Sequence, residues 1–381
     1  MLAIHNANLI LETEILRDGV LLIEAGRIFG IGKKGELNIP PEAERFDAQG
    51  AYIGPGFVDL HVHGGGGFMF SDAPEQAAQH FLSHGETTVL ATLYYQLQKE
   101  EFLVAIDRIK TAMQAENGRS IAGFYMEGPY MNPKYGAMPE KNCWKGEIRA
   151  EDYTEIVDRA GTLAKVWAIA PERSGVEPFV AYARKVNPTV TIAVGHSEAT
   201  PLQVQSFKPY GLTLQTHCMN ATGRRTEWVG TRGCGPDEAC LLDPNMYAEL
   251  LSDSMGIHVN ADLQRLILQV KGVDHVILIS DSFVGDETSL ERLKQVTDLT
   301  FDADGNLCGS CLTLDMACRN VMKHTGCSMV QAFLMASRNP ARVLGLDHEI
   351  GTVECGKKAN LVFVDHRFHV LNVMLEGQFV E

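Results

Sequence analysis

Residues 55–63 read PGFVDLHVH, a mostly apolar run that ends in His61-Val62-His63. Side chains two positions apart on a β-strand point the same way, so both imidazoles would face one point. A run this rich in apolar residues is typical of a strand that is buried on both faces. The stretch therefore predicts a buried parallel strand that carries ligand side chains at its carboxyl end.

Seven more runs of this kind follow, separated by segments that can hold helices, such as 75–85 and 151–161. Eight buried strands alternating with helices predict a (β/α)₈ barrel of the TIM type, in the α/β class. The alternative is a doubly wound open sheet, but no G-x-G-x-x-G follows the first strand. The eight predicted strands are 56–62, 87–93, 121–126, 165–170, 190–194, 212–216, 248–251 and 275–279.

The two ends of the chain have a different pattern. Residues 1–53 and 351–381 alternate apolar and polar residues and are interrupted by Gly and Asp, as short half-buried strands are. We predict one small β-sandwich domain formed by both termini around a barrel of residues 54–350, because chain termini often lie close together. Two unrelated β flaps are the alternative.

Composition limits the class of partner. The 381 residues carry a formal net charge of -15, which disfavours nucleic acid and anionic membrane surfaces. No apolar run reaches transmembrane length, and no secretory signal is evident at the N-terminus. Nine cysteines at irregular spacing indicate reduced thiols, so we expect a cytoplasmic location.

Ligand-type side chains end five of the eight predicted strands. The carboxyl ends of barrel strands share one rim, and imidazole with carboxylate suits Zn²⁺ or another first-row divalent ion. We expect a metal site, with two ions about 3.5–4 Å apart that share a carboxylate; zinc is expected, and iron, manganese and cobalt are alternatives. A lone histidine is more often a core residue, but five strand ends are hard to explain in that way. The side chains are His61, His63, Glu127, His196, His217 and Asp281.

Other chemistry has weaker support. The C-x-x-C pair at 308 and 311 has no second pair beside it, as a structural zinc site would require. GHSEA at 195–199 lacks the G-x-S-x-G pattern of serine hydrolases. His258 follows the seventh strand at the same rim. It is a candidate substrate contact, with a core or solvent role as the alternative.

The chain resembles the N-acetylglucosamine-6-phosphate deacetylase family of the amidohydrolase superfamily. The similar stretches run in order along nearly the whole chain: PGFVDLHVHGGGG, MEGPYMNPKYGA, VGHSEAT, THCMNA, MGIHV, ISDSF, LCGSCLTL and the tail that contains GTVECGKKANLVFVD. The resemblance implies removal of the acetyl group from an amino sugar 6-phosphate, metal ligation by Glu127, His196 and His217, and Asp281 as the catalytic acid and base. The implied substrate contacts are Ala137, Asn220, Ala221, His258, Leu307, Cys308 and Gly309.

Two departures from the family pattern concern the substrate. Met138 stands where many members have a histidine, and the segment after Ala221 lacks the family's G/H-R-E-P-G motif. The arginine of that motif reaches the phosphate of a neighbouring subunit, so the resemblance implies a homodimer. Arg232 is the best match by its spacing from His258, with Arg224 and Arg225 as alternatives.

Other readings stay open. A deacetylase acting on N-acetylgalactosamine 6-phosphate, or an amidohydrolase acting on another N-acyl or cyclic amide, would carry the same ligand-type side chains at the carboxyl ends of its barrel strands. A dihydroorotase-like enzyme would need a lysine at the end of the fourth strand, where the chain has Pro171-Glu172. A non-catalytic binding protein is the least expected, because it would have no reason to keep all six ligand-type side chains.

Overall fold

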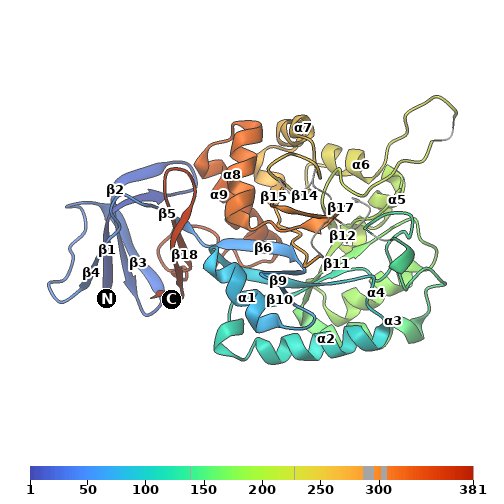
Figure 1. Ribbon diagram of the computed structural model, residues 1–381, viewed down its shortest axis with the longest axis horizontal. Helices are drawn as coiled ribbons and strands as arrows, with labels where there is room; N and C mark the ends of the chain where they lie inside the picture. Colours follow the sequence, from blue (N-terminus) through green and yellow to red (C-terminus); the bar gives the residue numbers. More distant parts are fainter. Residues whose placement is uncertain (138, 227, 286–295, 302–306, 381) are drawn as a thin grey trace.

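The computed structural model describes residues 1–380 except positions 138, 227, 286–295 and 302–306. Eight parallel strands form one sheet in the order β15-β14-β13-β12-β11-β10-β9-β6 and curve into a barrel (Figure 1). Each predicted run overlaps one of these strands, so the predicted barrel is confirmed. The strands are β6 (Phe57–Val62), β9 (Glu86–Tyr94), β10 (Ile121–Glu127), β11 (Ala164–Ile169), β12 (Thr191–Val194), β13 (Leu212–Gln215), β14 (Tyr247–Leu250) and β15 (Val276–Leu278).

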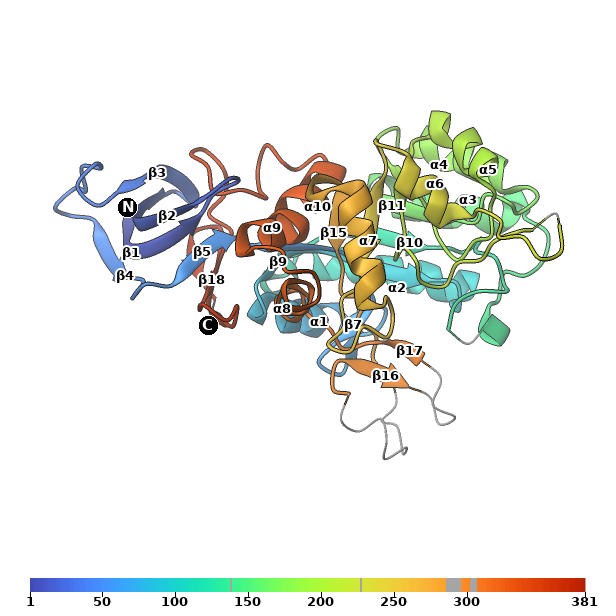
Figure 2. The same ribbon diagram turned by 90° about the horizontal axis from the view of Figure 1, so that it is seen from above.

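Helices surround the barrel, and their apolar faces pack on its strands in one large core (Figures 1 and 2). The described part of the chain contains no helix that is both long and apolar enough to cross a membrane. The helices are α1 (Pro74–Ser83), α2 (Lys99–Ala112), α3 (Ala150–Ala160), α4 (Val176–Val186), α5 (Pro201–Ser206), α6 (Pro236–Leu242), α7 (Ala261–Lys271), α8 (Leu314–Thr325), α9 (Met329–Phe333) and α10 (Asn339–Val343), with a π-helical turn at Leu334–Arg338.

The barrel is closed by polar contacts beyond the end of β15. Ser280 N donates to Asp59 Oδ2 at 3.2 Å, and Asp281 N donates to His61 O at 2.8 Å. Asp59 is fully buried on β6, so its carboxylate supplies acceptors where the regular strand pairing stops. This seam brings Asp281 beside the histidines of the first strand.

Both termini build the second sheet, as predicted. Its order is β20-β19-β18-β5-β1-β2-β3, with β4 paired to β1, and it lies beside the barrel next to α8 and α9 (Figures 1 and 2). A side chain at Gly54 would come within 2.2 Å of Phe333, so glycine allows the close approach of β5 to α9. The strands are β1 (Leu2–Ile10), β2 (Ile15–Glu24), β3 (Arg27–Lys33), β4 (Glu44–Asp47), β5 (Tyr52–Pro55), β18 (Leu361–Val364), β19 (Val370–Leu375) and β20 (Gln378–Phe379).

Two short antiparallel ribbons stand at the mouth of the barrel. β7 (Gly64–Gly65) pairs with β8 (Phe68–Met69), and β16 (Leu299–Phe301) pairs with β17 (Leu307–Ser310). Ser310 N donates to Asp281 O at 3.4 Å, and Phe283 N donates to Ser310 O at 2.9 Å. The second ribbon is therefore bonded to the segment that follows β15.

Candidate active site

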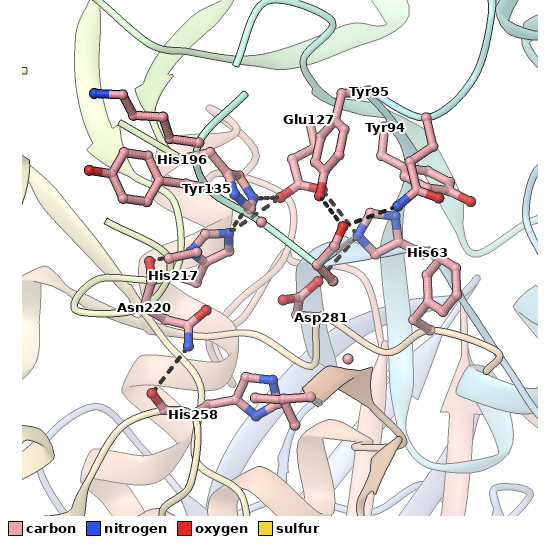
Figure 3. Close-up of a pocket in the computed structure, with 18 residues that line it drawn as sticks. His63, Tyr94, Tyr95, Glu127, Tyr135, His196, His217, Asn220, His258 and Asp281 are labelled. Atoms are coloured by element: carbon pink, nitrogen blue, oxygen red, sulfur yellow. Dashed lines mark hydrogen bonds and ion pairs between the residues drawn. The ribbon is translucent and has the colours of Figure 1, made fainter. Parts of the chain in front are cut away.

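Six ligand-type side chains meet at the carboxyl ends of the barrel strands. Five of them line a cavity of about 340 Å³ at the mouth of the barrel, and Figure 3 shows the imidazole and carboxylate groups of these five converging on its floor. His61 is fully buried beneath the cavity. The six are His61, His63, Glu127, His196, His217 and Asp281.

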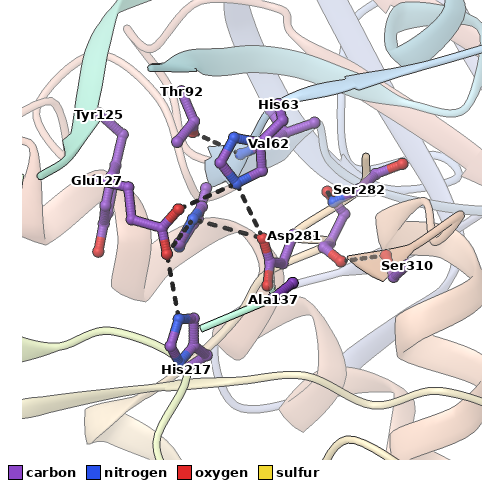
Figure 4. A network of polar contacts seen from close by, with 12 residues as sticks. Val62, His63, Thr92, Tyr125, Glu127, Ala137, His217, Asp281, Ser282 and Ser310 are labelled. Carbon is purple, nitrogen blue, oxygen red and sulfur yellow. Dashed lines mark hydrogen bonds and ion pairs between the residues drawn. The ribbon is translucent and has the colours of Figure 1, made fainter. Parts of the chain in front are cut away.

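Glu127, the last residue of β10, lies at the centre of this group (Figure 4). Its Oε1 atom is 2.7 Å from His196 Nε2 and 3.3 Å from His217 Nε2. Its Oε2 atom is 3.3 Å from His63 Nε2, and His61 Nε2 lies 3.7 Å from Oε1. One carboxylate therefore contacts a pair of imidazoles on each side.

Asp281 completes the group on the side of the first strand. Its Oδ1 atom lies 3.2 Å from His63 Nε2 and 3.5 Å from His61 Nε2. Burial acts to raise the pKa of this carboxyl, but the two imidazoles outweigh burial and lower the pKa to about 2. Asp281 is therefore ionised at neutral pH, and part of its side chain faces the cavity.

Three of the six residues adopt a backbone conformation that side chains rarely take. The φ angles of His196, His217 and Asp281 are 43°, 28° and 46°, in or near the left-handed region. Each residue follows the end of a strand, where the chain turns sharply and directs the side chain into the cavity. Such conformations cost about 1–3 kcal/mol each and concentrate at functional sites.

A buried carboxylate that the sequence reasoning missed orients two of the imidazoles. Glu249 on β14 is fully buried, and its Oε2 atom accepts from His61 Nδ1 at 3.2 Å and from His217 N at 3.1 Å. His217 Nδ1 donates to the backbone oxygen of Asn220 at 3.1 Å. These bonds place the protons of both rings on Nδ1 and leave Nε2 of each ring facing Glu127, as in histidines that bind metals.

The donor set fits a divalent metal ion. Two groups have ligand atoms within 4.8 Å of one another, and they share Glu127. His61 Nε2 is buried without a hydrogen-bond partner. Burial keeps the pKa of His196 below its ordinary value, so its ring offers a lone pair. The groups are His61, His63 and Glu127, and Glu127, His196 and His217.

The same cavity is lined by most of the predicted substrate contacts. Asn220 Nδ2 donates to the backbone oxygen of His258 at 3.2 Å, which ties two segments of the wall together (Figure 3). Met138 lies outside the described residues, and of Cys308 only the backbone is described. The predicted residues that line the cavity are Ala137, Asn220, Ala221, His258, Leu307 and Gly309.

The three candidate arginines do not line this cavity. Arg232 is 76% exposed, with Nη2 3.8 Å from Glu238. Arg224 Nε donates to the same carboxylate at 2.8 Å. Arg225 Nε donates to Glu198 at 3.1 Å, close to the cavity residues Lys134 and Tyr135.

Comparisons with known proteins find relatives that match this chain along most of its length. The N-acetylgalactosamine-6-phosphate deacetylase of Escherichia coli O157:H7 is 31% identical over 359 residues, which cover 89% of this chain and 90% of that protein. The N-acetylglucosamine-6-phosphate deacetylase of Homo sapiens is 28% identical, over 96% of this chain and 93% of that protein.

A solved structure covers nearly the whole chain. It is a mutant of the N-acetyl-D-glucosamine-6-phosphate deacetylase of Mycobacterium smegmatis in complex with N-acetyl-D-glucosamine-6-phosphate, with a TM-score of 0.83 and 28% identity over 99% of this chain and 98% of that chain. The sequence profile of the amidohydrolase family matches residues 52–380. By its sequence, its fold and the residues at its barrel mouth, this chain belongs to the amidohydrolase family.

Proposed function

We propose that the protein hydrolyses the N-acetyl group of an N-acetyl amino sugar 6-phosphate, giving the amino sugar 6-phosphate and acetate. The observation that carries this proposal is the set of four imidazoles and two carboxylates at and just beneath the floor of one cavity. The relatives named above act on amino sugar phosphates by their names. One is named for galactosamine and the other for glucosamine, so both sugars are candidates.

We further propose that the six floor residues bind two divalent metal ions per chain, with Glu127 shared between them. Zinc is the expected ion, and iron, manganese and cobalt are alternatives. Bound there, such ions supply Lewis acidity toward the acyl carbonyl and the attacking water. The proposal is supported by the two groups of ligand atoms that share Glu127 and by the bonds that fix the His61 and His217 rings.

In this proposal the chain's own groups move the proton and hold the substrate. Asp281 takes a proton from the attacking water and delivers it to the nitrogen of the leaving amine, as a general base and then a general acid. His258 donates to the carbonyl oxygen or to a sugar hydroxyl. Asp253 Oδ2 accepts from the His258 backbone N–H at 2.9 Å and lies 3.6 Å from His258 Nδ1, beyond hydrogen-bond distance, so it fixes the backbone that carries the ring.

Subunit structure and cell location stay predictions. We propose a homodimer in the cytoplasm, in which Arg232 reaches the cavity of the partner subunit. The high exposure of Arg232 in its own chain is compatible with this role.

A substrate screen tests the proposed activity. We expect the purified protein to release acetate from N-acetylglucosamine 6-phosphate or N-acetylgalactosamine 6-phosphate, and to prefer one of the two. The screen also includes both sugars without phosphate and a cyclic amide. Turnover of the cyclic amide alone would contradict the proposal and favour a different amidohydrolase reaction.

Replacing Glu249 with glutamine should weaken metal binding. One oxygen of the carboxylate accepts from both His61 Nδ1 and His217 N; an amide oxygen in its place lacks the negative charge that strengthens both bonds, and loss of such an orienting group typically costs about 10–100-fold in metal affinity or activity. Metal affinity is measured by competition with a chelator. Glu151→Gln, on the surface of α3, is the control, and an unchanged affinity of Glu249→Gln would exclude the orienting role.

A further inference from the structure

We infer that Lys134 recognises the phosphate of the substrate and makes the site selective for phosphorylated sugars. This inference rests on the proposed function. Of the cavity-lining residues that the structure describes, Lys134 is the one with an ammonium or guanidinium group. The chain has a formal net charge of -15, and the two proposed divalent ions lie at the acyl end of the substrate, not at its phosphate end. A dianionic substrate therefore needs a local cation.

Lys134 belongs to a set of four residues that we call the Glu198 cluster: Lys134, Tyr135, Glu198 and Arg225. The Glu198 carboxylate accepts from Lys134 Nζ at 2.8 Å, from Tyr135 OH at 2.9 Å and from Arg225 Nε at 3.1 Å. Two cations share the Glu198 carboxylate, so neither is fully neutralised by it. Lys134 has three N–H donors, and Glu198 uses one of them.

Two of the three loops that carry this cluster, those of Lys134 and Glu198, are locked together by a second carboxylate. Glu172, which follows β11, accepts from Asn132 Nδ2 at 2.8 Å, from Ser197 Oγ at 2.7 Å and from Glu198 N at 2.7 Å. Asn132 in turn accepts from Lys134 N at 3.0 Å. The backbone around Lys134 and Glu198 is therefore fixed before a substrate arrives, which lowers the entropic cost of binding.

The position of the cluster suits one end of an elongated substrate. Figure 3 shows Tyr135 next to His196 on one side of the cavity, with His63 on the opposite side. This loop lies close to the floor, because a side chain at Gly136 would come within 2.3 Å of Tyr95 Oη and 2.9 Å of His196 Nδ1. A sugar whose acyl group lies over the floor can thus extend its phosphate toward Lys134, where the remaining N–H donors lie.

The test compares sugar pairs that differ only in the 6-phosphate. For Lys134→Met, we expect kcat/KM for the phosphorylated N-acetyl sugar to fall about 10- to 100-fold more than kcat/KM for the sugar without phosphate. This is the fold-change expected for losing one hydrogen bond to a charged group. Lys141→Met, outside the cavity, is the matched control. Equal responses of the two substrates to Lys134→Met would overturn the inference.

A binding measurement separates this inference from the proposed activity. Calorimetry compares glucosamine 6-phosphate with glucosamine, and galactosamine 6-phosphate with galactosamine, on the wild type and on Lys134→Met. A preference for the phosphate ester that Lys134→Met loses supports the inference even if the protein deacetylates neither sugar. A preference that survives in Lys134→Met and is lost in Arg232→Ala would assign the phosphate to Arg232 and overturn it.

Glu198→Gln distinguishes anion binding from a structural role of Lys134. If Lys134 serves only to hold Glu198, both variants remove the same ion pair and should behave alike. If Lys134 binds phosphate, Glu198→Gln removes a competing anion and should keep or strengthen the preference for the phosphate ester, opposite to Lys134→Met. Parallel losses in the two variants would contradict the inference.

Discussion

Replacing Asp281 with asparagine is expected to lower kcat by about 10²–10⁴-fold, the typical contribution of general acid–base catalysis. Asp281 reaches the cavity at the end of β15, and its Oδ1 atom lies within 3.5 Å of both histidines of the first strand. The amide of asparagine cannot accept a proton from water or return it to the leaving nitrogen. Steady-state kinetics on the preferred sugar phosphate measure the effect.

Two controls keep this result interpretable. Asp281 is also a proposed metal ligand, so metal content must be determined for each variant, and rates compared at equal content. Asp262→Asn, on the exposed first turn of α7, controls for the loss of a carboxylate elsewhere. Turnover of Asp281→Asn within a few-fold of the wild type would remove Asp281 from the mechanism.

The barrel could be predicted because each of its strands is a separate apolar run. The strand β9 is buried along nearly its whole length, as are β6 and β12, and burial on both faces requires such runs. The terminal sheet was predictable for a different reason: its strands alternate apolar and polar residues, and Gly26 turns the chain between β2 and β3. The sequence pattern does not predict how the barrel closes, because the hydrogen bond between Asp59 and Ser280 joins residues that are 221 positions apart.

The ligand-type residues of the site could be predicted from residue type at the strand ends. The residues that orient and hold them could not. Glu249 lies inside the apolar run of β14 and has no motif around it, so its role emerges only when β14 packs beside β13. Lys134, Glu172 and Glu198 come from three loops that the fold joins through hydrogen bonds. Arg232 was chosen by spacing along a loop, and spacing does not determine where a loop folds.

Replacing Glu127 with glutamine is expected to lower metal content below that of the wild type and turnover by at least about 100-fold. Glu127 contacts His63, His196 and His217 within 3.3 Å, and groups that only orient ligands already contribute about 10–100-fold. The imidazoles around Glu127 are buried. Removing the carboxylate charge leaves any charge on these rings without its partner, which is costly in a buried site. The substitution should therefore also lower the stability of the apoprotein. Elemental analysis and thermal unfolding with and without added Zn²⁺ measure both effects.

The response to added Zn²⁺ is the more discriminating measurement. An ion that binds the folded chain raises its melting temperature by mass action, so the wild type should be stabilised and Glu127→Gln much less so. Glu151→Gln, an exposed carboxylate on α3, should respond as the wild type does. Because both groups of ligand atoms contain Glu127, its loss should weaken the two sites together, whereas His196→Ala should weaken only one. Full metal content and normal turnover in Glu127→Gln would refute the proposal that Glu127 is a ligand shared by two metal sites.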